Sequence, residues 1–230
     1  MWQDKFWYHV VVEAEAGLRE RKKQQTRQLI AEKARRLFDE RGFDAVTVAQ
    51  VAKAADVSEA TVFNYFPTKE SLFYSQMQAF EEALVNAVRQ RPAGESVPSA
   101  FRRFIHNGAD RLAEEEAAGA ILAAARVVGA SPALRARERE IVADYTDVLA
   151  GLIAQETRAR PGDLEPLVVA GALMAAHRAI VSHVRSEVLA GRRGRALARE
   201  ARTQMKRAFD RLERGLAGYG VVVKETLPRA

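Results

Sequence analysis

The sequence predicts an all-α protein in which a three-helix, helix-turn-helix head precedes a larger helical domain. From residue 24 onwards Ala, Leu, Glu, Arg and Gln dominate, and apolar residues recur at i, i+3 and i+4, the spacing of one helix face. The stretch Gly42–Leu72 has the pattern of a short helix, a tight turn, a second short helix and the start of a third. No segment alternates convincingly as a strand, and the β-branched run Val221–Val223 is isolated, so we expect it to be a tail.

Composition excludes several classes of protein. A chain of 230 residues with 48% hydrophobic and 29% charged residues is expected to form one or two globular domains. It has no cysteine, which excludes a disulfide framework and a thiolate metal site. No apolar run approaches the roughly 18 residues that a membrane span needs, and Met1–Gly17 lacks the apolar core of a secretory signal. The net charge of +6 favours a polyanionic partner.

The first two helices of the head have recognisable end signals. The first helix is expected over Gln24–Arg41 and ends at Gly42, because glycine readily adopts the left-handed conformation that terminates a helix. The second is expected over Val48–Ala55. Thr47 and Gln50 fit a capping box, in which each side chain bonds the other residue's backbone N–H group.

The turn and the third helix follow directly. Asp56 stands where the turn needs a left-handed residue, Val57 is expected in the core, and Ser58 is expected to cap a helix over Glu59–Phe66. Val62 and Phe66 are four residues apart and point inward. The outer side of this helix then carries Glu59, Ala60, Thr61, Phe63, Asn64 and Tyr65.

These outer residues suit the major groove of DNA. Ala60 and Thr61 can touch a thymine methyl group, and Asn64 can read adenine. Glu59 can either accept a hydrogen bond from cytosine N4 or repel phosphate. Lys69, at the start of the next helix, is placed to contact a phosphate. The alternative is a helix pair that merely packs.

A basic segment directly precedes this pattern. Eight Lys and Arg residues crowd it: Arg19, Arg21, Lys22, Lys23, Arg27, Lys33, Arg35 and Arg36. Such a run is often only a solvated helix face. Its position before a helix-turn-helix favours contact with DNA phosphates, for which Arg21, Lys22 and Lys23 are the candidates.

The block over about Thr26–Tyr74 resembles the TetR family of one-component transcriptional regulators. The residues at the family's spacings are Gly42, Thr47, Val51, Ala52, Ala55, Val57, Ser58, Ala60, Thr61, Tyr65, Phe66, Lys69, Glu70 and Leu72. The resemblance implies a homodimer with a DNA-binding head on an all-α effector domain. It also implies DNA-facing positions at Thr47, Ser58, Ala60, Thr61, Phe63, Asn64, Tyr65 and Lys69. Asp56 departs from a frequent Gly, and Phe63 departs from the usual Tyr, so one hydroxyl contact to phosphate is missing.

Beyond the head the sequence predicts six helices. One runs from Lys69 to about Arg89, and the Pro-, Gly- and Ser-containing segment Arg91–Pro98 is the strongest break after it. The others are expected over Ser99–Glu115, Ala117–Val128, Pro132–Ala159, Leu164–Leu189 and Ala196–Gly218. We divide the chain into residues 1–18, an extension expected to be poorly ordered, 19–72, the head, 73–220, a ligand-binding and dimerisation domain, and 221–230, a tail.

The last two predicted helices carry apolar stripes that fit a four-helix dimer interface. The candidates for that interface are Leu167, Leu173, Val181, Val184, Met205, Phe209, Leu212 and Leu216. The alternative is that both stripes close only the core of the monomer.

An effector pocket is expected among the helices predicted over residues 99–189. The candidates to line it are Phe101, Phe104, Ile105, Leu122, Arg126, Tyr145, Leu149, Met174, His177 and Arg178. A mostly apolar lining with a few polar anchors suits a hydrophobic ligand with a polar end. Each of these residues can instead be ordinary core.

The sequence does not indicate an enzyme. Its four histidines are scattered, and it has no phosphate-cradling glycine loop and no nucleophile elbow, so we expect no catalytic residue, no metal and no cofactor. We expect a cytoplasmic, nucleoid-associated homodimer that binds duplex DNA and no membrane. It would be a repressor released from a palindromic operator by a small lipophilic effector. The alternatives are a transcriptional activator or a ligand-independent architectural DNA-binding protein.

Overall fold

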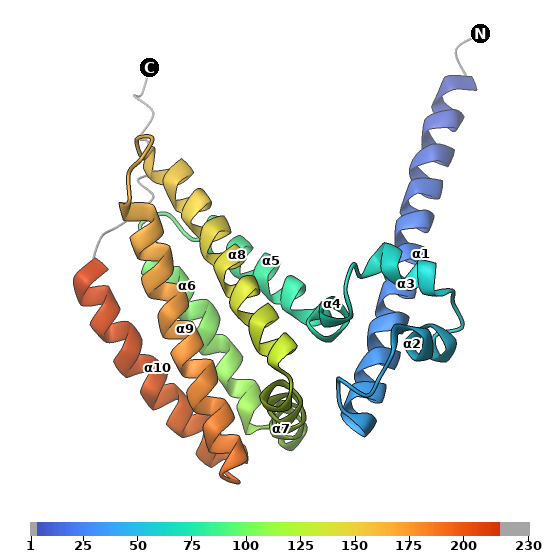
Figure 1. The fold of residues 1–230 in the computed structure, drawn as a ribbon. Helices are drawn as coiled ribbons and strands as arrows, with labels where there is room; N and C mark the ends of the chain where they lie inside the picture. The colour runs from blue at the N-terminus through green and yellow to red at the C-terminus, as the bar shows by residue number, and fades with distance from the viewer. Residues whose placement is uncertain (1–3, 217–230) are drawn as a thin grey trace. The chain divides into compact units, whose positions relative to one another are not determined.

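The computed structural model describes the backbone of residues 4–216 and the side chains of residues 17–75, 80, 82–114 and 117–215. The chain divides into two compact units, Met1–Gln76 and Met77–Ala230, each of which is described by itself. Within the described range all regular structure is helical, ten α-helices and one 3-10 helix (Figure 1). The predicted all-α class is confirmed. The predicted tail over residues 221–230 lies outside the described range.

The head is built from α1 (Asp4–Arg41), α2 (Val48–Ala54), α3 (Glu59–Tyr65) and α4 (Lys69–Phe73). Helix α1 packs against α2 and α4, and α2 packs against α3. The apolar residues at helical spacing close one core, which includes Ile30, Ala34, Phe38, Val51, Val62, Phe66 and Leu72. Burial of this shared core, rather than intrinsic helix propensity, accounts for the stability of such short helices.

The first helix begins earlier than expected. It starts at Asp4 and not at Gln24, and residues 17–25 are exposed on every face. Residues 4–16 are helical in the backbone, and whether residues 1–18 are ordered in solution stays a prediction. The end of the helix is confirmed: Gly42 has φ +80°, and its N–H group donates to the Phe38 carbonyl at 2.9 Å.

The predicted helix Lys69–Arg89 is broken in the structure. Tyr74 leaves the helical conformation at φ −89° and ψ 17°, and α5 (Ser75–Arg89) follows α4 as a separate helix. The Tyr74 side chain is buried and meets the Phe73 ring edge-on at 5.0 Å. The free energy gained by burying the Tyr74 side chain in the head outweighs the cost of interrupting the helix. The sequence displays only the helical pattern, so it does not predict this break.

The boundary between the two units falls at Gln76–Met77, near the division proposed at residues 72 and 73. The segment Arg91–Pro98, the strongest break in the sequence, lies within the second unit. It is held there by Arg91, whose buried guanidinium donates to the Val88 carbonyl at 2.7 Å and pairs with Glu156 at 2.5 Å. A buried arginine needs such partners, and they tie this loop to the helix that carries Glu156.

The second unit contains α5, α6 (Val97–Gly108), a 3-10 helix η1 (Ala109–Ala113), α7 (Glu115–Ala130), α8 (Pro132–Thr157), α9 (Glu165–Leu189) and α10 (Gly194–Leu216). The predicted helix over residues 99–115 is therefore α6 followed by η1. Helix α9 packs against α6, α7, α8 and α10 and so forms the centre of the unit. Ser131 caps α8 by accepting from the Leu134 N–H group, with Pro132 at the first helical position, as expected.

Helix α9 contains a longer apolar run than we expected from the sequence. By length and composition alone it meets the criteria for a membrane span, which contradicts the statement that no apolar run approaches that length. The core helix of a helical domain meets the same criteria. Contact with four other helices of its unit accounts for the apolar inward face of α9.

Candidate nucleic-acid interface and predicted sites of the second domain

Helix α3 presents one buried and one exposed face, as predicted. Val62 and Phe66 are buried in the head. On the opposite side Glu59, Ala60, Phe63 and Asn64 are exposed, and Thr61 and Tyr65 are half-buried. Phe63 is 47% exposed, so its ring is available to a partner on this face. All six residues of α3 proposed to face DNA are therefore at least partly accessible, the four exposed ones more than Thr61 and Tyr65.

Side-chain hydroxyl groups cap α2 and α3, and the cap of α2 leaves its hydroxyl proton available. Thr47 Oγ1 accepts from the Gln50 N–H group at 3.3 Å, and the Gln50 side-chain oxygen accepts from the Thr47 N–H group at 2.9 Å. The capping box is confirmed. Ser58 Oγ accepts from the Thr61 N–H group at 3.0 Å and lies 2.8 Å from Thr61 Oγ1. Because Thr47 uses its oxygen only as an acceptor in this cap, its hydroxyl proton can be donated to a phosphate.

The turn between α2 and α3 has the predicted geometry. Asp56 adopts φ +54°, in the left-handed region that Asp tolerates. The Val57 N–H group donates to the Ala52 carbonyl at 3.0 Å, which closes the end of α2. Val57 is only half-buried and Ala52 is fully buried, so the small alanine, more than Val57, occupies the space where the two helices cross.

Lys69 has a role that the sequence did not suggest. Its ammonium group donates to the carbonyls of Phe43 at 3.0 Å and Val46 at 3.1 Å, and lies 4.2 Å from the centre of the Phe43 ring. These bonds hold the loop between α1 and α2 against the start of α4. An ammonium group has three protons, so two are used within the head and one is left for a phosphate. The phosphate contact stays a prediction.

The basic segment belongs to α1, and its residues 21–23 precede the point at which α1 contacts the end of α3. Arg21, Lys22 and Lys23 are all exposed. Arg27 lies over the ring of Phe66, 4.9 Å from its centre, and Phe66 is the residue that ends α3. A helix rises about 1.5 Å per residue, so the three basic side chains lie within about 10 Å along α1 of this contact. A polyanion seated on α3 can therefore reach them.

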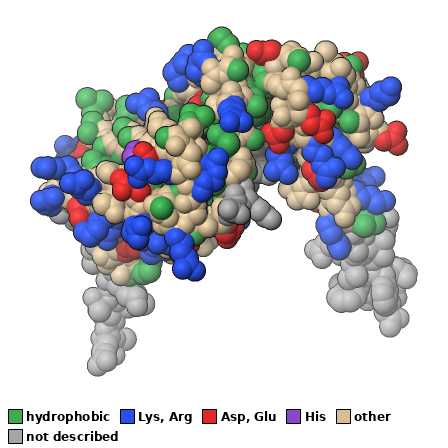
Figure 2. All heavy atoms as spheres, turned by 90° about the horizontal axis from the view of Figure 1, so that it is seen from below, with side chains coloured by type: hydrophobic (Ala, Val, Ile, Leu, Met, Phe, Trp, Pro, Cys, Tyr) green, Lys and Arg blue, Asp and Glu red, His purple; other side chains and the backbone are tan. Residues whose placement is uncertain are grey.

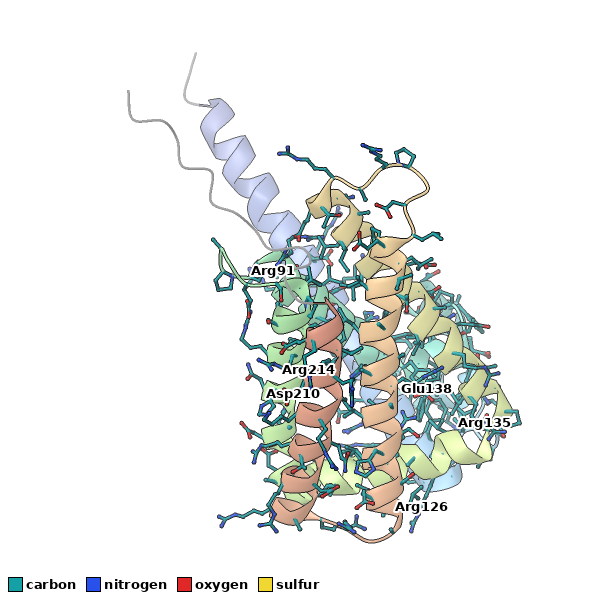
Figure 3. All side chains as sticks on the ribbon, turned by 90° about the vertical axis from the view of Figure 1, so that its left-hand side faces the viewer. Arg91, Arg126, Arg135, Glu138, Asp210 and Arg214 are labelled. Carbon is teal, nitrogen blue, oxygen red and sulfur yellow. The ribbon has the colours of Figure 1, made fainter. Side chains whose placement is uncertain are left out.

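The candidate effector residues divide into an interior and an exposed group. Phe101, Ile105, Tyr145, Leu149 and Met174 are buried, and Phe104, Leu122 and His177 are half-buried. Arg126 and Arg178 are exposed, and Figure 3 shows Arg126 at one end of the helical unit. These two arginines do not join the buried group, because a guanidinium without a paired partner is more stable in solvent.

The candidate dimer residues also divide. Leu173, Val184, Met205 and Phe209 are buried within the protomer, and Phe209 meets the Phe101 ring at 5.9 Å. Their side chains close the monomer core, which was the alternative, and they offer no free surface for a second copy. Leu167 is exposed, Val181 and Leu212 are half-buried, and the side chain of Leu216 lies outside the described residues.

The sequence analysis missed several contacts that involve no local pattern. Phe80 on α5 stacks on His177, with ring centres 5.3 Å apart and planes at 16°. Arg27 over Phe66 and Lys69 on the Phe43 and Val46 carbonyls are the corresponding cases in the head. No spacing rule relates these partners, so only the folded chain brings them together.

Comparison with known proteins agrees with this geometry. Residues 30–75 match the family model of bacterial regulatory proteins of the tetR family, and residues 95–217 match that of the MftR C-terminal domain. The HTH-type transcriptional regulator TcmR of Streptomyces glaucescens is 30% identical over 176 residues, which cover 71% of this chain and 75% of TcmR.

Solved structures share the fold. NalD of Pseudomonas aeruginosa, the secondary repressor of the MexAB-OprM multidrug efflux pump, superposes with a TM-score of 0.52 at 20% identity, over 84% of this chain and 97% of that one. SmeT in complex with triclosan has a TM-score of 0.52 at 16% identity, over 90% and 98% of the two chains. At these identities the likeness concerns the fold alone.

Proposed function

The chain belongs to the TetR family of transcriptional regulators and is a DNA-binding regulator, and from that premise we propose that it is a repressor. It binds a near-palindromic operator as a homodimer, in the cytoplasm and at the nucleoid, and a small lipophilic effector releases it. The exposed face of α3 is the observation that supports this proposal. It has small side chains at the N-terminal end of the helix and a polar side chain, Asn64, that can read a base, and basic side chains of α1 lie nearby.

The head supplies both kinds of DNA contact. Ala60, Thr61 and Asn64 are the residues that can meet base edges, since they are accessible on the outer face of α3. Phosphates can be met by two exposed cap residues and by three exposed basic residues of α1: Thr47, Ser58, Arg21, Lys22 and Lys23. Phosphate contacts position the head, and the α3 residues select the sequence.

A second copy of the chain is best received by α9. The stripe formed by Val168, Ala172, Ala175, Ala179 and Ser182, three or four residues apart, is exposed or half-exposed along the helix. Small side chains allow two helices to approach closely, so two such stripes can pack across a twofold axis. We name these five residues the α9 stripe.

Helix α10 suits the edge of that interface better than its centre. Its apolar face is buried in the protomer, and its exposed face carries four arginines to which no partner is assigned among the described residues: Arg195, Arg199, Arg207 and Arg211. Figure 2 shows many Lys and Arg side chains, with Asp and Glu among them, on the face of the second unit that it displays. In a twofold dimer equal charges on equal surfaces repel, which disfavours direct contact between two α10 faces.

Effector control requires that the ligand bind one state of the protein better than another. A ligand that prefers the state whose two heads are wrongly spaced for DNA shifts the population away from the operator. The apolar interior of the second unit is the proposed ligand site. SmeT, which has the same fold, was solved with triclosan, a chlorinated aromatic molecule.

The test begins with selection of bound duplexes from fragmented host DNA by the full-length protein. We expect a twofold-symmetric motif with half-sites centred about 34–36 Å apart, or a multiple of that distance. Light scattering should give twice the 25.5 kDa chain mass. A small-molecule screen for release from the selected duplex then identifies the effector class. An asymmetric motif bound by a monomer would contradict the proposal.

A further inference from the structure

Three phenylalanine rings are grouped with the imidazole of His177 in the second unit. Phe80 stacks on the imidazole at 5.3 Å, and Phe101 meets it edge-on at 6.5 Å with planes at 76°. Phe104 lies 5.3 Å from Phe80. We call Phe80, Phe101, Phe104 and His177 the His177 cluster. Its members come from α5, α6 and α9, so it joins helices that are distant in the sequence.

The imidazole of His177 is neutral and its hydrogen-bonding capacity is not fully used. Burial, and to a lesser extent the positive charge of Arg185, lower the pKa of His177 to about 4. Nδ1 is buried and finds no hydrogen-bond partner among the residues that the structure describes. A buried polar atom without a partner is uncommon in native proteins and is costly, so its presence requires an explanation.

The surroundings of His177 are not those of a closed core position. Phe80 and Phe104 are only half-buried, whereas Phe101 is fully buried. A molecule can therefore reach His177 by displacing the Phe80 and Phe104 rings while the Phe101 side of the core stays intact.

We propose that the His177 cluster binds a flat aromatic molecule that carries a hydroxyl group. The rings of Phe80 and Phe104 stack on the ligand, because stacked and tilted ring pairs are favourable at these separations. In this proposal the neutral imidazole of His177 carries its proton on Nε2, so that Nδ1 accepts a hydrogen bond from the ligand hydroxyl. This inference rests on the proposed function in one respect, namely that the bound molecule is the effector that releases the protein from DNA.

Occupancy of the cluster acts on the segment that joins the two units. Phe80 lies in α5, which begins at Ser75, immediately after the buried Tyr74 of the head. A ligand that displaces the Phe80 ring pushes on α5, and α5 is the chain's only covalent path between the units. Ligand binding and DNA binding can therefore be coupled without any further contact.

The test uses full-length protein without DNA, so its outcome is independent of whether the protein represses. The probes are naphthol, methoxynaphthalene, which accepts but cannot donate a hydrogen bond, and naphthalene, which does neither. Calorimetry measures the affinity of each for the wild type, for His177→Phe and for His177→Asn, in which an amide replaces the ring. His183→Phe is the matched control, since His183 is a half-buried histidine on the same helix outside the cluster.

We expect naphthol to bind the wild type and His183→Phe about three- to tenfold more tightly than either analogue, the effect of one hydrogen bond. His177→Phe should abolish this preference while still binding naphthalene, and His177→Asn should restore part of it. Labelled methionine methyl groups locate the site: of the four methionines, Met174 is one turn from His177 and should shift most.

Three results would overturn the proposal. One is equal binding of naphthol and methoxynaphthalene by the wild type, which excludes donation to His177. Another is an unshifted Met174 methyl group. The third is no binding of naphthol at all. The first two comparisons need no variant, so they decide the matter even if a His177 substitution prevents folding.

Discussion

Replacing Lys69 by alanine separates a structural role in the head from a role in DNA binding. The substitution removes two hydrogen bonds from the ammonium group, to the carbonyls of Phe43 and Val46, and its contact with the Phe43 ring. Both carbonyls belong to the loop between α1 and α2, which Lys69 connects to α4. We expect the head to open more easily as well as to bind DNA less tightly.

The magnitude follows from those contacts. A hydrogen bond from a charged donor contributes about 1.5–3 kcal/mol, and we take the lower value because Lys69 is only half-buried. The ring contact adds about 0.5–1 kcal/mol. Releasing the ordered lysine side chain returns about 1.5–2 kcal/mol of entropy. The net loss of stability is about 2 kcal/mol, equivalent to about a 30-fold change in the opening equilibrium.

Amide hydrogen exchange of the intact protein measures this locally. Peptides from the head should lose about 30-fold protection in Lys69→Ala, whereas peptides from α8 and α9 should not change. Lys53→Ala is the control, because Lys53 is an exposed lysine on α2. Protection in Lys69→Ala equal to that in Lys53→Ala would refute the structural role.

DNA binding gives the second readout. If the remaining ammonium proton contacts a phosphate, Lys69→Ala weakens all duplexes about equally and lowers the salt slope by about one. An unchanged slope combined with weaker binding would assign the whole effect to the opening of the head. A loss confined to certain sequences would contradict the phosphate contact.

Four further outcomes are expected. Asn64→Ala should relax selection at one base position by about 1–3 kcal/mol; a binding-site selection identical to the wild type would refute its reading role. Deleting Met1–Gly17 should leave operator affinity intact in a titration, and a large loss would show that these residues contact DNA. Because the folded pKa of His177 is about 4 against 6.5 in the unfolded chain, the unfolded state binds the extra proton, and stability falls as pH drops from 6.5 towards 4. The loss is at most about 3 kcal/mol, and urea unfolding of His177→Phe should lack that part of the pH dependence. Ala175→Glu, in the α9 stripe, should halve the mass seen by light scattering, whereas Ala120→Glu, exposed on α7, should not.

Local chemistry made the head predictable. The capping box of Thr47 and Gln50, the Ser58 cap and the left-handed Asp56 all involve partners within a few residues of one another. Such contacts form in a helix end or a turn whatever surrounds it, so the residue types and their spacing indicate them. The inward face of α3 was predictable for the same reason, since Val62 and Phe66 are one helical turn apart.

In the second unit the sequence predicted the positions of the helices, but not which other helix or subunit packs on each helix face. The helices predicted over Pro132–Ala159 and Leu164–Leu189 agree closely with α8 and α9. The apolar stripe of α10, however, was assigned to a dimer, whereas Met205 and Phe209 are buried within the protomer. Periodicity reveals an apolar face but does not identify the surface that packs on it.

The sequence by itself therefore determined the all-α class, the helix ends marked by Gly42, Thr47 and Ser58, and the residues on the outer face of α3, because the caps and the faces of a helix depend on interactions over three or four positions. The tertiary structure decided the break at Tyr74, the anchoring of Lys69 on the Phe43 loop, and the stacking of Phe80 on His177. Each of these depends on packing between side chains that are distant in the chain or on burial that competes with local helix formation. The free energy of burial depends on contacts that exist only in the assembled core, so a local sequence pattern cannot predict it.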